Sequence, residues 1–208
     1  MVSEIRIYVE GGGDGKDTKA RVREGFSKFL SEFKKIARAK KIGFTIIACG
    51  RRNSAHRDFL NALSTHPDAF NLLLVDPEAP VKVKSPKQHL INRDSWNLSG
   101  IEDDCIHLMV QVVESWLVAD VDTLAKYYGQ GFQKSSIPEN SNVEEISKEQ
   151  IESCLKRATQ KTQKKAYHKI NHCPEILGML NTQKVRSKAP YCDRLFVTLI
   201  ALLEPPAS

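Results

Sequence analysis

The first 75 residues alternate short apolar segments with stretches of helical periodicity. The apolar segments are residues 4–9, 43–49 and 70–75, and the stretches between them, residues 16–39 and 53–63, carry apolar side chains every three or four positions. A spacing of three or four buries one face of a helix, whereas a short apolar run bounded by turn residues is typical of a strand. Strand, helix, strand, helix and strand in so few residues predict a parallel sheet with right-handed crossovers.

The rest of the chain has a different character. Residues 79–100 contain prolines and lysines without clear periodicity, which indicates a loop or an inserted excursion. Residues 107–111 are predicted to form a fourth strand, followed by a short helix over 112–120. Asp122 is a candidate cap for another helix that Gly129 ends. From about Ser147 we predict two or three helices.

These segments define the predicted architecture. We expect an α/β core over residues 1–120, with a parallel sheet and helices on both of its faces. Residues 121–208 are expected to form a helical C-terminal extension packed on that core. A length of 208 residues suits one domain, or one domain with a modest appendage.

Composition excludes several classes of protein. Hydrophobic residues make up 41% of the chain and charged residues 27%, as in globular proteins with a core. No apolar run approaches the ~20 residues of a membrane span, and a strand begins almost at the N-terminus, which favours a cytoplasmic protein without a signal peptide. The five cysteines are odd in number and form no CxxC pair, so we expect neither a disulfide framework nor a zinc site.

An acidic residue follows each of two apolar strands. Glu10 ends the first strand, and Asp76 and Glu78 follow the third. Functional groups of parallel sheets collect at the carboxyl ends of neighbouring strands. Three carboxylates gathered there would repel one another unless a cation lay between them, so this pattern predicts a metal site. The alternative is structural, because acidic residues after strands also cap helices and begin turns.

A glycine-rich segment, residues 11–15, separates the first strand from its helix. Such segments bind nucleotide phosphates in several folds, but this one lacks the G-x-x-x-x-G-K-[ST] spacing. Glu10 stands directly before the glycines, and an unmetallated carboxylate there would repel phosphate. A P-loop is therefore not predicted.

The two acidic strand ends resemble the Toprim domain of topoisomerases, primases and overcoming-lysogenization-defect-type nucleases. Val9-Glu10-Gly11 is similar to the first Toprim element, a strand that ends in Glu-Gly. Val75-Asp76-Pro77-Glu78 is similar to the second, Asp-x-Asp, with Glu in place of the last Asp. Residues 8–14, 113–120 and 189–195 also resemble a bacterial family of uncharacterised Toprim-related proteins.

This resemblance implies phosphodiester chemistry that depends on Mg²⁺ or Mn²⁺, as in a nuclease of a bacterial defence system or mobile element. It implies that Glu10 is a metal ligand or general base and that Asp76 and Glu78 are ligands. Glu114 and Asp14 are further candidate ligands, and Lys16 or a C-terminal lysine is a candidate for stabilising charge on the phosphate. The alternative is a non-catalytic Toprim-fold binding subunit that works with a separate ATPase partner.

A formal net charge of +6 favours a polyanionic partner. We predict that one basic cluster of the C-terminal third binds nucleic acid and forms a wall of a substrate groove beside the carboxylates. It consists of Lys161, Lys164, Lys165 and Lys169. Tyr167 and His168 interleave with these lysines, as aromatic residues do in single-strand binding sites. The alternative is a solvated helix face.

Overall fold

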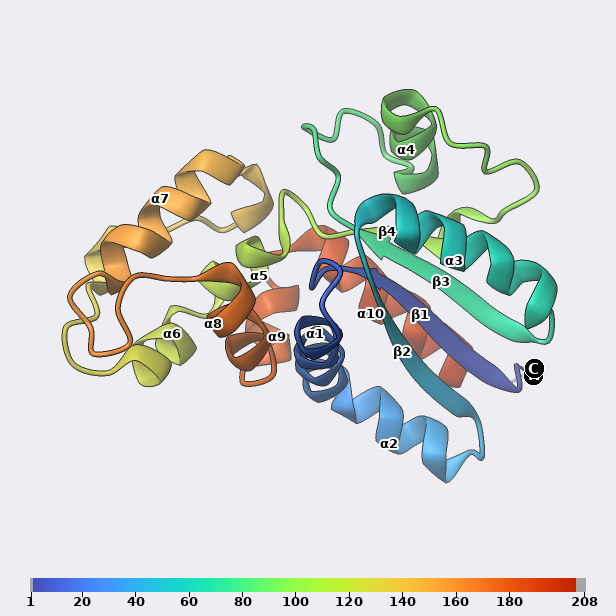
Figure 1. Ribbon diagram of the computed structural model, residues 1–208, viewed down its shortest axis with the longest axis horizontal. Coiled ribbons are helices and arrows are strands. Elements are labelled where there is room, and N and C mark those ends of the chain that lie inside the picture. Colours follow the sequence, from blue (N-terminus) through green and yellow to red (C-terminus); the bar gives the residue numbers. More distant parts are fainter. Residues whose placement is uncertain (1, 205–208) are drawn as a thin grey trace.

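A computed structural model describes residues 2–204 and shows a four-stranded, fully parallel sheet (Figure 1). The strand order is β2-β1-β3-β4. The bounds of the strands are β1 (Glu4–Glu10), β2 (Gly43–Gly50), β3 (Ala69–Val75) and β4 (Ile106–Leu108). The predicted α/β class is confirmed, and the architecture is consistent with a Toprim-like core.

Both faces of the sheet are buried, which explains why the strands are almost continuously apolar. Ile5, Ile7 and Val9 of β1 face one hydrophobic cluster, while Tyr8 faces the other. β3 alternates in the same way between its two faces, with Leu73 on the side of Tyr8. Because both faces are covered, the ends of the strands, rather than a face of the sheet, remain available for a functional site.

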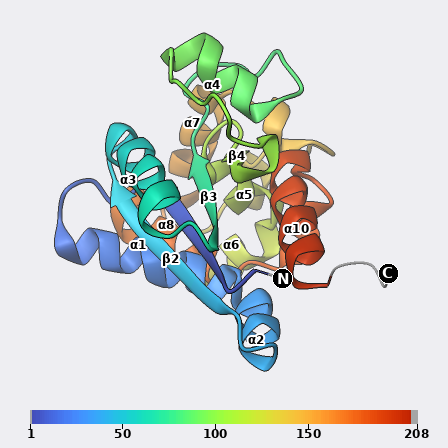
Figure 2. The same ribbon diagram turned by 90° about the vertical axis from the view of Figure 1, so that its right-hand side faces the viewer.

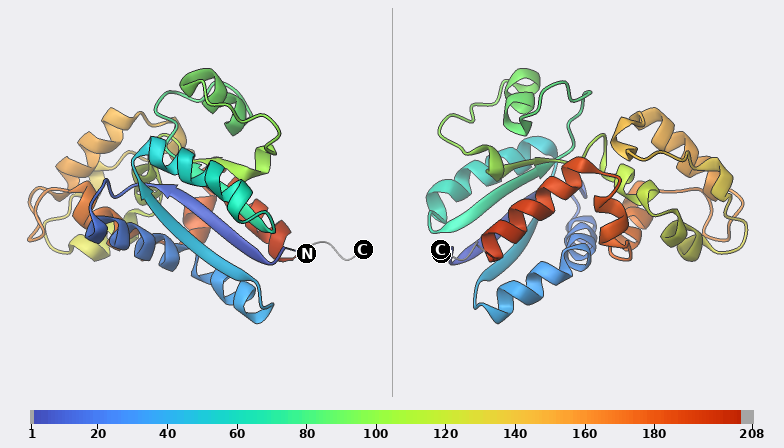
Figure 3. Two further views of the ribbon diagram at one scale, coloured as in Figure 1. Left: turned by 45° about the vertical axis from the view of Figure 1, so that its right-hand side comes forward. Right: turned by 180° about the vertical axis from the view of Figure 1, so that it is seen from behind.

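Helices cover the two faces unequally (Figures 2 and 3). α3 (Arg52–Thr65) covers the face to which Tyr8 points, and its Phe59 packs edge-on against that ring. The other face is covered by α1 (Lys16–Phe29), α2 (Ser31–Ala39) and α10 (Pro190–Leu203). The last helix of the predicted extension thus packs in the same layer as the first two helices of the core.

A lobe of helices lies beyond the carboxyl ends of the strands, at the left of Figure 1. It comprises α5 (Val113–Ala119), α6 (Val121–Tyr128), α7 (Lys148–Thr159), α8 (Lys169–Leu177) and α9 (Thr182–Arg186). The short helices η1 (Asp103–Cys105), η2 (Lys134–Ser136) and η3 (Val143–Glu145) lie in the connections. α8 touches α1 closely: a Cβ added to Gly25 would lie 2.5 Å from the carbonyl oxygen of Pro174.

The segment 79–100, predicted to be a loop or an inserted excursion, contains helix α4 (Pro86–Asp94). Ser85 caps this helix by accepting a hydrogen bond from the Gln88 amide, and Pro86 takes the first helical position. Proline there is favourable because its missing N–H has no intrahelical partner. This helix was not predicted, because it is short and polar, so its periodicity is weak while its capping signal is clear.

Other features also differ from prediction. The fourth strand, predicted over 107–111, covers only Ile106–Leu108. The single helix predicted over 16–39 is broken at Leu30, whose non-helical backbone lets α2 turn and bury Phe33 against the sheet. The cap of α6 is Asp120 and not Asp122, since Asp120 accepts the Thr123 amide. The C-terminal part has four helices rather than two or three. No helix in residues 2–204 is long and apolar enough to cross a membrane.

Candidate functional site

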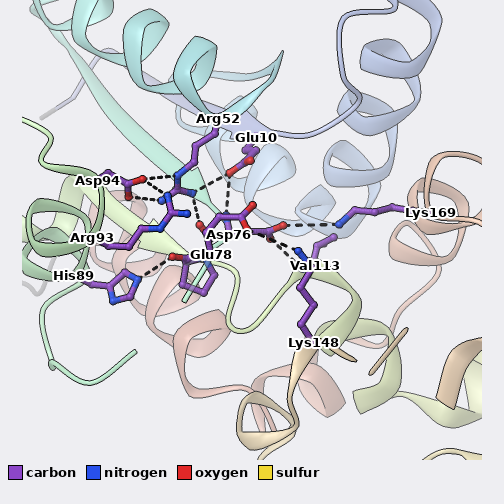
Figure 4. Close-up of polar contacts among 11 residues, drawn as sticks. Glu10, Arg52, Asp76, Glu78, His89, Arg93, Asp94, Val113, Lys148 and Lys169 are labelled. Atoms are coloured by element: carbon purple, nitrogen blue, oxygen red, sulfur yellow. Dashed lines mark hydrogen bonds and ion pairs between the residues drawn. The ribbon is translucent and has the colours of Figure 1, made fainter. Parts of the chain in front are cut away.

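The carboxyl ends of β1 and β3 bring Glu10 and Asp76 together (Figure 4). Glu10 is the last residue of β1, and Asp76 follows the last residue of β3. β1 lies between β2 and β3, so the chain moves to one side of β1 for the second strand and to the other side for the third. Open α/β sheets bind ligands at such a reversal of strand order.

The Glu10 carboxylate is held on one of its two oxygens. Its Oε2 accepts hydrogen bonds from the Asp76 amide at 3.2 Å and from Arg52 Nη1 at 3.2 Å. Burial raises the pKa of Glu10, Arg52 opposes this shift and the negative charge of Glu78 adds to it. Glu10 therefore binds a proton more readily than an exposed glutamate does.

Arg52 ties the site to the α4 excursion. Its Nε and Nη2 donate to Asp94 at 3.1 and 2.7 Å, and its guanidinium lies 4.9 Å from the centre of the Trp96 ring. Arg52 also donates to the main-chain oxygen of Asp76. A guanidinium fixed at so many points orients Glu10 rather than moving toward a ligand.

Among the carboxylates of the site, Asp76 has the most strongly raised pKa. It is 8% exposed; its Oδ1 accepts the Val113 amide at 3.2 Å, and its Oδ2 lies 3.8 Å from Lys169 Nζ. Burial, opposed by the attraction of Lys169 and reinforced by Glu10 and other nearby carboxylates, raises the pKa of Asp76 to about 7. Extra positive charge at this point would stabilise the ionised form.

Lys169 lies between two carboxylates. Its Nζ donates to Glu114 Oε2 at 3.1 Å, while the other oxygen of Glu114 accepts from the Tyr167 hydroxyl at 3.0 Å. Glu114 is almost fully buried, and these two donors satisfy one carboxylate oxygen each. In Figure 4, Lys169 reaches Asp76 from the side opposite Arg52.

Glu78 is held more loosely than the other carboxylates. Its backbone is in the left-handed region at φ 57°, where residues other than glycine are uncommon. Its Oε2 lies 3.8 Å from Lys148 Nζ at the start of α7. The preceding Pro77 is fixed through its carbonyl oxygen, which bonds with His89 Nε2 at 2.9 Å. The strained backbone is thus anchored on one side, while the carboxylate stays free to turn.

A glycine turn forms the opposite rim. Gly11, Gly12 and Gly13 all have positive φ. The turn is pressed against the end of β2, because a Cβ on Gly50 would lie 2.2 Å from the Gly13 carbonyl oxygen. Gly50 has φ +87°, so both its backbone conformation and its close contact require glycine.

The carboxylates, the glycine turn and α8 enclose a cavity of about 300 Å³. Of the residues predicted for the site, Glu10, Asp76, Glu78 and Lys169 line it. Glu114 lies directly behind Lys169. The strand ends and the first residue of α8 therefore converge as expected, and α8 overhangs the strands.

Other predicted site residues are not brought to the cavity. Asp14 is paired with Arg51 on the surface, at 2.6 Å, and Lys16 is exposed at the start of α1. The remaining lysines of the predicted basic cluster, Lys161, Lys164 and Lys165, are exposed in the segment before α8. Lys164 lies over the Tyr127 ring, 4.6 Å from its centre. Only Lys169 of that cluster reaches the cavity.

Sequence reasoning missed three basic groups, Arg51, Arg52 and Lys148. Arg51 and Lys148 line the cavity, and Arg52 bonds Glu10. A signal for the two arginines was present, since they follow Gly50 at the carboxyl end of β2 and hence lie at the same sheet edge. No signal for Lys148 was present, because its place depends on how α7 folds back toward the sheet.

The donor chemistry of the site fits a hard divalent cation. The site offers carboxylate and carbonyl oxygens, the type of ligand that Mg²⁺ and Mn²⁺ prefer. Within residues 2–204, no three acidic, histidine or cysteine side chains are grouped closely enough to hold a metal ion by themselves. Mg²⁺ commonly binds through one or two carboxylates and keeps several waters, so the neighbouring Glu10 and Asp76 meet its requirement.

A larger hollow of about 1090 Å³ lies elsewhere, around Asp120 and the segment 134–141. Four of the charged groups that line it pair with one another: Lys184 binds Asp120 and Asp122, and Lys134 binds Asp122. We place the functional site at the smaller cavity, because it contains carboxylates in mutual repulsion at the switch point of the sheet.

Together, the fold and the site define an α/β protein with an acidic cavity at the carboxyl edge of a parallel sheet. Residues 9–200 match the model of the family described as domain of unknown function (DUF4276), and the chain belongs to this family. The match includes every carboxylate and lysine that lines the cavity. No curated protein and no solved structure matches the chain.

Proposed function

We propose that this protein is a divalent-metal-dependent phosphodiesterase that acts on nucleic acid, as the Toprim resemblance implies. The observation that carries the proposal is the convergence of Glu10, Asp76 and Glu78 with Lys169 in one cavity at the switch point. Carboxylates that repel one another are suited to a cation, and a lysine beside them is suited to a phosphate.

Each side chain of the site has a role in this proposal. Asp76 and Glu78 would hold Mg²⁺ or Mn²⁺, which when bound polarises a phosphate and lowers the pKa of water. Glu10 either shares in holding the ion or accepts the proton of the attacking water, for which its raised pKa is suited. Lys169 donates to a phosphate oxygen, and Glu114 positions Lys169.

Arg52 acts indirectly in this scheme. It fixes Glu10 and the Asp76 main chain, and Asp94 fixes Arg52 in turn. Arg52 is therefore a positioning residue. We further propose that the protein acts in the cytoplasm. The Toprim resemblance implies that it belongs to a bacterial defence system or a mobile element.

The test is cleavage of plasmid DNA and of RNA in Mg²⁺ or Mn²⁺. We expect Glu10→Gln to abolish cleavage and Asp14→Asn to leave it unchanged. Asp14 is the matched control because it belongs to the same glycine turn but its side chain does not line the cavity. No cleavage by the wild type, or equal cleavage by the Glu10→Gln variant, would refute the proposal.

A second function is favoured by one observation. The three carboxylates that line the cavity each lie near a basic side chain, Arg52, Lys169 or Lys148, as they would in a site that needs no metal. A non-catalytic Toprim-fold subunit that works with a separate ATPase partner fits that pairing. Thermal unfolding separates the two functions: a metal site gains stability with Mg²⁺ or Mn²⁺ by mass action, whereas a binding subunit gains nothing specific to the ion.

A further inference from the structure

The floor of the cavity is apolar, although its rim is charged. The side chains that form the floor come from α1, from α8 and from the segment between β4 and α5. They are Val22 and Phe26 of α1, Met109 of that segment, Val113 at the start of α5, and Cys173 and Leu177 of α8. The contact of Gly25 with Pro174 joins the two helices beside this floor. The cavity is therefore a pocket beside the carboxylates rather than an open groove across them.

The size of the pocket limits what it can hold. Its volume of about 300 Å³ is at the lower end of the range of about 300–1,000 Å³ for small-molecule sites. That space suits one ligand of one or two rings. A duplex could not enter, because each of its bases is stacked on neighbours and paired across the helix.

The side chains that line the pocket suit a nucleotide base of any identity. The Thr18 hydroxyl, which lines the pocket, already donates to the Gly12 carbonyl oxygen, so it is not free to donate to a base. Apolar walls accept the flat face of any base, as in proteins that bind single strands without sequence preference. At the mouth, Lys169 and Lys148 supply the positive charge that a phosphate requires.

We propose that the pocket receives one unstacked nucleotide of a single strand, with its base on the apolar floor and its phosphate at the lysine rim. This inference rests on the proposed function and names its substrate class: a single strand or a frayed end rather than an intact duplex. Extrusion of a base from a duplex requires its base pair to be broken, which is not required in a single strand.

The test measures binding rather than cleavage. Fluorescence anisotropy is recorded in Ca²⁺ with a labelled single-stranded oligonucleotide and with its blunt duplex, and a gel checks that both remain intact. We expect the single strand to bind at least tenfold more tightly. Equal or tighter binding of the duplex, or no binding of either nucleic acid, would overturn the proposal.

Two variants test the pocket itself. Val22→Trp fills the floor, and Ile170→Trp narrows the mouth at a side chain that is 48% exposed and so endangers folding less. Each should weaken single-strand binding at least tenfold. The matched control is Val197→Trp, at an exposed position of α10 outside the pocket, which should change nothing. Unchanged binding by the folded Val22→Trp or Ile170→Trp variant would refute the pocket assignment.

A last arm separates two sources of the same chemistry. A nucleoside 5′-monophosphate should compete with the oligonucleotide only in large excess; competition at equimolar concentration would assign the pocket to free nucleotides and overturn the strand proposal. Glu10-dependent cleavage without single-strand preference would refute this inference alone. Pocket-dependent binding without any cleavage would refute the proposed chemistry alone.

Discussion

Asp76 and Asp120 are both buried beside a lysine, yet their surroundings have opposite effects. Asp120 accepts from the Thr123 hydroxyl at 2.7 Å, the Asn181 amide at 3.0 Å and Lys184 at 3.3 Å. Burial alone would raise the pKa of Asp120, but these donors together lower it. Asp76 has one amide donor and a more distant lysine, and its pKa rises to about 7.

The comparison separates a structural carboxylate from a functional one. The donors around Asp120 compensate for its lost hydration, so its ionised form stabilises the lobe. Asp76 is buried among other carboxylates and has too few hydrogen-bond donors around it. Its ionised form therefore destabilises the fold when no cation is bound. Burial alone does not identify a functional acid. A buried carboxylate with too few hydrogen-bond donors around it does.

The largest expected effect tests this contrast directly. Asp120→Asn should lower the free energy of unfolding by about 2–4 kcal/mol, because it removes the ion pair with Lys184 and an acceptor for the Asn181 amide. Asp76→Asn keeps an acceptor for the Val113 amide and removes the repulsion. It should be neutral or stabilising by about 1 kcal/mol in metal-free buffer at pH 8.

Chemical denaturation of both variants measures the difference. Similar destabilisation by the two substitutions would contradict the distinction between a structural and a functional aspartate. The direction of the Asp76→Asn effect matters most, since functional groups are often kept at a cost in stability and their removal then stabilises the fold.

Glu144 extends the comparison to a third buried carboxylate. It accepts the amides of Tyr191 and Cys192 at the start of α10, and burial nevertheless raises its pKa from 4.5 to about 7. Between these two pH values the folded chain keeps a proton that the unfolded chain has lost. The contribution of Glu144 to stability is therefore full below pH 4.5 and is lost as the pH rises through 7.

Glu144→Gln should remove this pH dependence. From pH 5 to pH 7.5 the wild type should lose about 2 kcal/mol more of its free energy of unfolding than the variant does. Urea denaturation at the two pH values measures the difference. Parallel curves for the two proteins would show that the amides of α10 compensate fully for burial, as the donors of Asp120 do.

The sequence predicted the parts of the site that depend on local pattern. Glu10 and Asp76 were found because an apolar run fixes where a strand ends, and parallel strands end at one edge. Arg52 was missed although it directly follows β2 and so lies at the same edge; only its contact with Asp94 depends on the fold of α4, whose periodicity is weak. The basic cluster was predicted as a unit, but only Lys169 reaches the cavity, because the start of α8 decides which lysine points inward.

Gly25 tests how far the site depends on the contact between α1 and α8. Gly25→Ala would place its Cβ 2.5 Å from the Pro174 carbonyl oxygen, so α8 must shift. We expect a loss of about 2 kcal/mol in stability, since overpacking outweighs the gain in helix propensity. Gly178→Ala is the milder comparison at the same pair of helices, because its Cβ would meet side-chain atoms of Lys28 at 2.9 Å or more and no backbone atom. Equal melting temperatures for the two variants would show that the helices are not tightly joined.

The smallest expected effect concerns Lys169, the lysine beside Asp76. Lys169, 3.8 Å from Asp76, repels a divalent cation bound there, so Lys169→Met should bind Mg²⁺ about tenfold more tightly in calorimetry without nucleic acid. Lys184→Met, the same change beside Asp120, should leave Mg²⁺ affinity unchanged. Because Lys169→Met also leaves Glu114 buried without its cation, the double variant with Glu114→Gln checks that the gain does not come from a new ligand. Equal Mg²⁺ affinities for the wild type and the Lys169 variants would mean that Asp76 is no metal ligand, and that its raised pKa marks only an unfavourable burial.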